Sequence, residues 1–188
     1  MSGNVNQNYT REEFNEKQWI EIQEGLKNGI DVSLYANHFL HYKDMQLIRL
    51  GLQAGLNVEV LLDPKLNYRQ REEIYLGLSS GLNVFSYAND QYNEWKMREI
   101  RLGYEKGHDL EKYLDTHNHN QIHQIRLGLE ANIDVSKYDN VKYKQAHMAE
   151  IRMAIMEDLD IETLTDCSMS IEEIRKRRIA LQHKKDTN

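Results

Sequence analysis

One sequence pattern returns every 26 residues along most of this 188-residue chain. Each copy carries an isoleucine followed three residues later by glycine or alanine, and successive isoleucines are 26, 26, 26, 25 and 26 residues apart. These reference isoleucines are Ile22, Ile48, Ile74, Ile100, Ile125 and Ile151. A fixed short period is typical of one supersecondary unit that stacks on copies of itself. Such stacks present elongated binding surfaces more often than catalytic pockets.

Each copy contains the apolar pattern of a long helix. Mostly apolar residues stand three before and four after the reference isoleucine, on one helical face. A second apolar column, two residues after the reference, points to nearly the opposite side. From the second copy onward this column reads Leu50, Leu76, Leu102, Leu127 and Met153. We therefore expect each long helix to be sandwiched between neighbours.

Two columns of small residues follow each reference isoleucine, and their exceptions distinguish them. The column three residues on is glycine in five copies and Ala154 in the sixth, which predicts close approach by a neighbouring helix. Gly77→Ala is accordingly expected to be mild and Gly77→Leu severe. The column seven residues on is predicted to end the helix in a left-handed backbone, because Asn and Asp replace Gly in it. It reads Gly29, Gly55, Gly81, Gly107, Asn132 and Asp158.

Two further columns consist only of Asp and Asn. The first lies two residues past each stop and is expected to cap a second, shorter helix. The other lies six residues further on and is expected to turn the chain toward the next copy. They read Asp31, Asn57, Asn83, Asp109, Asp134 and Asp160, then Asn37, Asp63, Asn89, Asp115, Asn140 and Asp166. Each repeat is thus predicted to be a long helix followed by a short one.

The predicted fold is all-α: an α-solenoid of six 26-residue repeats over residues 10–166, preceded by a flexible N-terminus, 1–9. Residues 167–188 are expected to form a basic capping helix and tail that seals the last apolar face. Thr10 and Glu13 have capping-box spacing, so the first long helix is predicted to start near residue 11. Ser170 and Glu173 repeat that spacing before the last helix.

An arginine column directly follows the reference isoleucines and is the first candidate binding site. It contains Arg49, Arg101, Arg126 and Arg152, with Arg175 in the degenerate last copy. Such a ladder could clamp carboxylates or phosphates of a partner. Alternatively, each arginine pairs with an acidic residue of the neighbouring repeat and stiffens the stack. Both interpretations are open, because Glu21, Glu73, Glu99 and Glu150 stand beside the same column.

Three other clusters differ from the repeat pattern. His117, His119 and His123 lie where the repeat is one residue shorter; only Asp115 could complete a ligand set, so we interpret them as solvated loop residues and predict no metal or cofactor. Tyr92 and Trp95 are expected to be exposed and to form a hot spot for a protein partner. A basic run could contact nucleic acid or form the charged face of the capping helix. It comprises Arg175, Lys176, Arg177 and Arg178.

Charge is divided unevenly along the chain. Residues 171–188 carry six basic and three acidic side chains, so the total of −6 leaves −9 for residues 1–170. An acidic body of this kind repels nucleic acid and favours a partner with a basic surface. No Gly-rich phosphate loop, catalytic triad order, signal peptide or membrane span is recognisable, so we expect a cytoplasmic, non-enzymatic protein.

Residues 98–115 and 124–140 (REIRLGYEKGHDLEKYLD and QIRLGLEANIDVSKYDN) resemble short tandem repeats of uncharacterised proteins from Gram-positive bacteria and their phages or mobile elements. The resemblance implies a small cytosolic adaptor or inhibitor carried by a mobile genome. The sequence therefore favours a scaffold that binds another protein, with an inhibitor of a host defence nuclease, similar to an anti-CRISPR protein, as its most concrete form. The alternatives are a nucleic-acid-binding regulator that uses the basic C-terminal helix and the arginine ladder, and a self-associating structural protein.

Overall fold

The computed structural model describes residues 9–187, and the described chain is all-helical. Six long helices have 12 residues each: α1 Glu16–Lys27, α2 Tyr42–Gln53, α3 Tyr68–Ser79, α4 Glu94–Glu105, α5 His119–Glu130 and α6 Gln145–Met156. The last, α7 Ile171–Asp186, has 16. Short 3₁₀-helices are η1 Arg11–Glu13, η2 Val32–Leu34, η3 Glu59–Leu62, η4 Glu111–Tyr113, η5 Val135–Lys137 and η6 Glu162–Leu164. The predicted all-α class is confirmed, whereas residues 1–8 of the predicted flexible N-terminus lie outside the described part.

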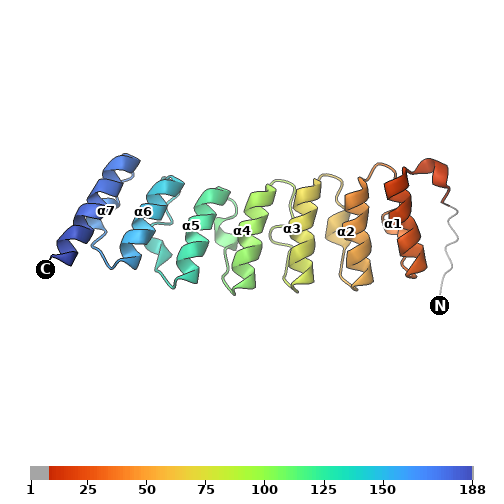
Figure 1. Ribbon diagram of the computed structural model, residues 1–188, viewed down its shortest axis with the longest axis horizontal. Helices are drawn as coiled ribbons and strands as arrows, with labels where there is room; N and C mark the ends of the chain where they lie inside the picture. Colours follow the sequence, from red (N-terminus) through yellow and green to blue (C-terminus); the bar gives the residue numbers. More distant parts are fainter. Residues whose placement is uncertain (1–8, 188) are drawn as a thin grey trace. The chain divides into compact units, whose positions relative to one another are not determined.

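The chain divides into two compact units, residues 1–97 and 98–188, and the boundary falls inside α4. In the first unit α1, α2 and α3 follow one another side by side (Figure 1). In the second unit α5, α6 and α7 do the same. The boundary between the two units therefore lies in the fourth long helix. The repeat pattern of the sequence does not indicate such a boundary.

The first long helix begins at an Asx cap rather than at the box predicted around Thr10. The Thr10 side chain caps nothing, and η1 is followed by the extended residue Phe14. The Asn15 side chain accepts a hydrogen bond from Gln18 N–H, and the Gln18 side chain accepts one from Asn15 N–H. This reciprocal pair satisfies two amide groups that have no partner within the helix. The predicted start of the first helix near residue 11 was therefore wrong, and the helix starts at Glu16.

Each long helix ends at the predicted left-handed residue. Values of φ are +69° to +78° at the four glycines of the second column, +56° at Asn132 and +51° at Asp158. The side chain of each predicted short-helix cap then accepts a hydrogen bond from the amide two residues on: Asp31 accepts from Ser33 N–H, and Asp160 accepts from Glu162 N–H. The short elements are single 3₁₀ turns, and residues 85–87 of the third repeat form only a hydrogen-bonded turn. The predicted stop and cap columns are confirmed.

The first glycine column admits the short element of the same repeat rather than another long helix. A Cβ added at Gly128 would overlap the Tyr138 hydroxyl, and one added at Gly25 would overlap that of Tyr35. Tyr35 and Tyr138 donate from these hydroxyls to backbone carbonyls of the long helix, at 3.0 and 3.1 Å. The expectation that Gly77→Ala is mild was wrong for the same reason, because its Cβ would meet the Tyr87 hydroxyl. Where alanine does occur, at Ala154, the tyrosine position holds Leu164.

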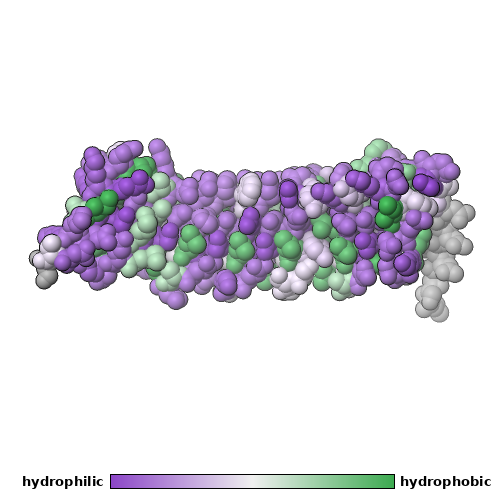
Figure 2. All heavy atoms as spheres, viewed as in Figure 1, coloured by the Kyte–Doolittle hydropathy of each residue, from purple (hydrophilic) through white to green (hydrophobic). Residues whose placement is uncertain are grey.

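The core lies on only one of the two apolar faces. All six reference isoleucines are 0% exposed. The second apolar column is half-buried, and Leu76 in it is 38% exposed. Figure 2 shows apolar residues on the viewed face as separate patches within hydrophilic surface. The fully buried residues thus lie on one face, but α2 lies between α1 and α3, and α6 between α5 and α7, so the prediction of a helix between neighbours is confirmed for these two.

Candidate protein-binding surfaces

The arginine column forms pairs within and between repeats. Arg49 Nε lies 2.8 Å from Glu21 Oε2, and Arg126 Nε lies 2.8 Å from Glu99 Oε2. Arg152 Nε donates to the neutral amide oxygen of Gln124 at 3.2 Å. The Arg101 side chain is 10% exposed and pairs with Glu105 one turn on in the same helix. Arg49 and Arg126 thus pair with a carboxylate of the neighbouring repeat, as the second interpretation describes, whereas Arg152 meets a neutral amide and Arg101 a carboxylate of its own helix.

Burial makes these pairs costly to break. Burial alone would lower the pKa of Arg126, but its hydrogen bonds with Glu99 and Glu130 outweigh that effect and raise it. Because the Arg126 side chain is only 10% exposed, removing either carboxylate would leave a nearly buried charge with fewer partners. Arg49 and Arg126 therefore link neighbouring repeats, and they present little guanidinium surface to a partner.

A glutamine column that the sequence analysis overlooked bonds a long helix to the loop that precedes the next long helix. Gln18, Gln70 and Gln121 stand at the third residue of their helices and are at most 5% exposed. Each Nε donates to two backbone carbonyls, 20 and 22 residues later in the chain. Gln121, for example, reaches Val141 at 3.0 Å and Tyr143 at 2.8 Å. The available signal was a polar residue recurring four before the reference isoleucine, on the helical face that becomes buried.

Three repeats replace this glutamine, with Asp44, Lys96 and His147, and the first and last of these form hydrogen bonds in different ways. At Asp44 the side chain cannot donate, and the buried guanidinium of Arg71 bonds it at 3.2 Å. Arg71 also donates to the carbonyls of Leu61 and Asp63. At His147 one ring nitrogen, Nε2, lies 2.7 Å from the Met169 carbonyl, while the buried Nδ1 has no hydrogen-bond partner. A buried polar side chain at this position thus forms a hydrogen bond in both repeats, although the group differs.

The histidine cluster does not behave as one unit. His117 is 5% exposed, and its Nε2 lies 2.7 Å from the Asp139 carbonyl. The interpretation of this residue as a solvated loop side chain was therefore wrong. His123 contacts Glu99 at 3.1 Å beside Arg126. Within residues 9–187, no group of three or more His, Cys, Asp or Glu side chains is arranged to hold a metal ion.

The basic end is largely neutralised by α6. Arg178 Nε and Arg175 Nε each lie 2.8 Å from a Glu150 oxygen, and Arg178 also bonds Glu157. Burial would raise the pKa of Glu150, but hydrogen bonds from Arg178 and Arg175 outweigh it and lower the pKa. Arg177 pairs with Glu173 in its own helix. Most charges of the run therefore hold α7 in place or pair locally.

The last helix also corrects the alignment of the arginine column. With Ser170 as its cap, Ile174 takes the place of Met148, not that of a reference isoleucine. Arg178 then occupies the column, and its bond to Glu150 spans 28 residues, like that of Arg49 to Glu21. The placement of Arg175 in this column was wrong, because the sequence comparison followed the isoleucine rather than the cap.

Aromatic side chains of the first unit remain exposed. Trp95 is 52% exposed, Phe39 85% and Phe85 64%. Tyr92 is half-buried; the Lys96 ammonium lies 5.3 Å from its ring centre. The predicted exposure is thus confirmed for Trp95, and Tyr92 is partly covered.

The exposed aromatics occupy columns that are polar in the other copies. The column of Trp95 holds Lys17, Lys43, Arg69, Asn120, Ala146 and Glu172, and that of Phe85 holds Ser33, Glu59, Glu111, Ser136 and Glu162. Phe39 likewise replaces Lys65, Gln91, His117, Lys142 and Ser168. Since the repeat folds with polar residues at nearly all of these positions, its packing does not require the three rings.

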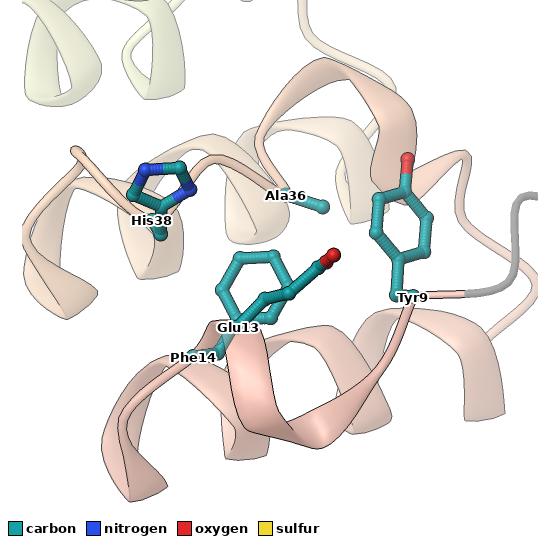
Figure 3. Close-up of a pocket in the computed structure, with 5 residues that line it drawn as sticks. All are labelled: Tyr9, Glu13, Phe14, Ala36 and His38. Carbon is teal, nitrogen blue, oxygen red and sulfur yellow. The ribbon is translucent and has the colours of Figure 1, made fainter.

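A hollow near the N-terminal end of the first unit has a volume of about 400 Å³. It is lined by Tyr9, Glu13, Phe14, Ala36 and His38. Figure 3 shows the Phe14 ring at its floor, with Tyr9 and His38 on opposite sides. The Tyr9 and Phe14 rings meet edge to face at 6.3 Å. This hollow can accommodate an apolar side chain and has a single carboxylate at its rim.

Comparison with protein-family models, curated proteins and solved structures finds no significant match to this chain. No helix within residues 9–187 combines the length and apolar character that crossing a membrane requires.

Proposed function

We propose that this chain is a non-enzymatic scaffold that binds a partner protein through the exposed aromatic residues of its first unit. The observation that carries the proposal is the exposure of Trp95, Phe39 and Phe85 at columns where other repeats have mostly polar residues. Exposed aromatic rings cost solubility and are enriched among residues that dominate protein interfaces. Arg49 contributes by joining neighbouring repeats of the first unit through its pair with Glu21.

Charge indicates the kind of partner. Residues 1–170 carry a net −9, which attracts a basic protein surface and repels nucleic acid. Together with the resemblance to repeats from phages and mobile elements, this supports an inhibitor of a nucleic-acid-binding host enzyme, such as a defence nuclease, as the specific form of the proposal.

The test compares Trp95→Ala/Phe85→Ala with Leu76→Ala as a matched control. Leu76 is an exposed apolar side chain of the same unit, but its column is apolar in four other repeats. A partner captured by the wild-type chain is purified, and its affinity is measured by calorimetry. We expect the aromatic variant to lose at least about tenfold in affinity and Leu76→Ala to lose little. Equal affinity for all three proteins would contradict the proposal.

The alternative, nucleic-acid binding through the C-terminal end, has weaker support. Arg175 and Arg178 bond Glu150 at 2.8 Å, which leaves Lys176 and Lys184 as the exposed cations least engaged in the described structure. Binding of a random DNA duplex at low salt that is lost in Lys176→Glu/Lys184→Glu would favour this alternative over the protein scaffold.

A further inference from the structure

In every repeat up to the fifth, a long helix is covered by the short element that follows it. In repeats one, three and five, two residues three apart fill the groove beside the small residue of the first column. Val32 and Tyr35 do so at Gly25, and Val135 and Tyr138 do so at Gly128. In repeats two and four the nearest side chain of the short element there is that of Val58 or Leu110. The covering residues are buried, with Tyr35 and Tyr138 at 0% exposure. The same packing of a short segment on a long helix thus recurs within the chain.

The last helix has the same groove without a cover from the described chain. By the alignment from Ser170, Ala180 takes the small-residue position and Lys184 the position of the left-handed stop. Because α7 continues as a helix through Lys184 to Asp186, the chain does not turn back at this position to cover it. An open hollow of about 350 Å³ lies there, lined by Thr163 of η6 and by Arg177, Ala180, Leu181 and Lys184 of α7.

We propose that this hollow, the α7 slot, binds a short acidic peptide of a partner protein with two aliphatic residues three apart. The aliphatic pair follows from the sixth repeat, whose small residue is also alanine and whose short element offers Ile161 and Leu164. The acidic character follows from Arg177 and Lys184 at the rim. Arg177 also donates to the Thr163 carbonyl at 3.1 Å, which holds its charge beside the slot. This proposal is independent of the aromatic surface of the first unit.

The chain itself supplies the probe. A labelled peptide with the sequence of residues 158–166, DLDIETLTD, contains both aliphatic residues and no basic side chain. Fluorescence anisotropy with the full-length protein is expected to show saturable binding that weakens with salt. Replacing both aliphatic residues of the peptide by alanine, or introducing Ala180→Trp in the protein, is expected to weaken binding at least about tenfold. Gln182→Trp, which places the same ring on α7 outside the slot, is the matched control.

A change of specificity gives a test that does not depend on loss of binding. A peptide with tyrosine in place of Leu164 is expected to bind the wild-type protein worse than DLDIETLTD, because Ala180 has a Cβ where Gly128 has none. Ala180→Gly is expected to reverse this preference, and the two protein forms are shown to be equally folded by circular dichroism. Absence of saturable binding, or an unchanged preference in Ala180→Gly, would overturn the proposal. Concentration-dependent association of the chain abolished by Ala180→Trp would instead assign the slot to a second copy.

Discussion

Repeats five and six are neighbours in the second compact unit and pack similar backbones with different residues. Repeat five combines Gly128 with Tyr138, whose hydroxyl donates to the Gln124 carbonyl. Repeat six combines Ala154 with Leu164, and both are 0% exposed. Repeat five does not tolerate the alanine of repeat six, because a Cβ at Gly128 would overlap the tyrosine hydroxyl, whereas repeat two combines glycine with leucine, Gly51 with Leu61. The difference teaches that the tyrosine occurs only with glycine in the first column, whereas leucine occurs with either glycine or alanine there.

The largest expected effect is that of placing the alanine of repeat six into repeat five. Gly128→Ala forces Tyr138 from its buried site, and overpacking of this kind costs about 3 kcal/mol of unfolding free energy. The double variant Gly128→Ala/Tyr138→Leu recreates the pair of repeat six and is expected to recover at least half of that loss. Urea unfolding of both single variants and the double variant measures the coupling. Strictly additive free energies would show that the two positions are independent and would break the comparison.

The next effect concerns the third residue of the helix. Gln121 makes two hydrogen bonds to carbonyls of the following loop, whereas His147 makes one and leaves Nδ1 without a partner. Gln121→Ala is expected to cost about 2 kcal/mol, because it leaves two carbonyls without their donor. His147→Gln is expected to stabilise the chain by about 1 kcal/mol, because it removes the buried nitrogen that has no partner. Thermal unfolding checks both values. A His147→Gln variant that is less stable than wild type would show that the ring is needed for packing.

Much of this packing was predictable from the sequence, but only at positions where the residue type has a single structural explanation. The left-handed stop could be read from Asn132 and Asp158, since few other residues adopt that backbone. The role of the first column could not, because smallness indicates a close approach without identifying what approaches. The same holds for the arginine column: the residue type predicts a carboxylate partner but not whether that partner lies in the chain or outside it. The exposure of Trp95 was predictable because it departs from its column.

A smaller effect tests the stops of the two repeats. Both use residues with a side chain, at φ +56° for Asn132 and +51° for Asp158. Asn132→Ala is expected to cost about 1 kcal/mol, because alanine adopts this backbone less readily than asparagine. Asn132→Gly is expected to cost nothing. Asp158→Gly differs, since it also removes an ion pair with Lys185 at 2.9 Å. If urea unfolding shows that Asn132→Gly is less stable than Asn132→Ala, the backbone explanation is contradicted.

The smallest effect distinguishes the side-chain contacts that link α6 to α5 from those that link α6 to α7. Repeat five presents the neutral amide of Gln124 to Arg152, whereas repeat six presents the Glu150 carboxylate, in the same column, to Arg175 and Arg178. The pKa of Glu150 is lowered below its ordinary value of 4.5, because hydrogen bonds from the two arginines outweigh burial. A lowered pKa in the folded state means that the stabilisation is complete above pH 4.5 and is lost as the pH falls through the folded-state pKa. Glu150→Gln should therefore destabilise the chain more at pH 6.5 than at pH 3, and Gln124→Ala should cost the same at both. Urea unfolding at the two pH values measures these differences, and an equal cost of Glu150→Gln at both would show that its charge does not hold α7 to α6.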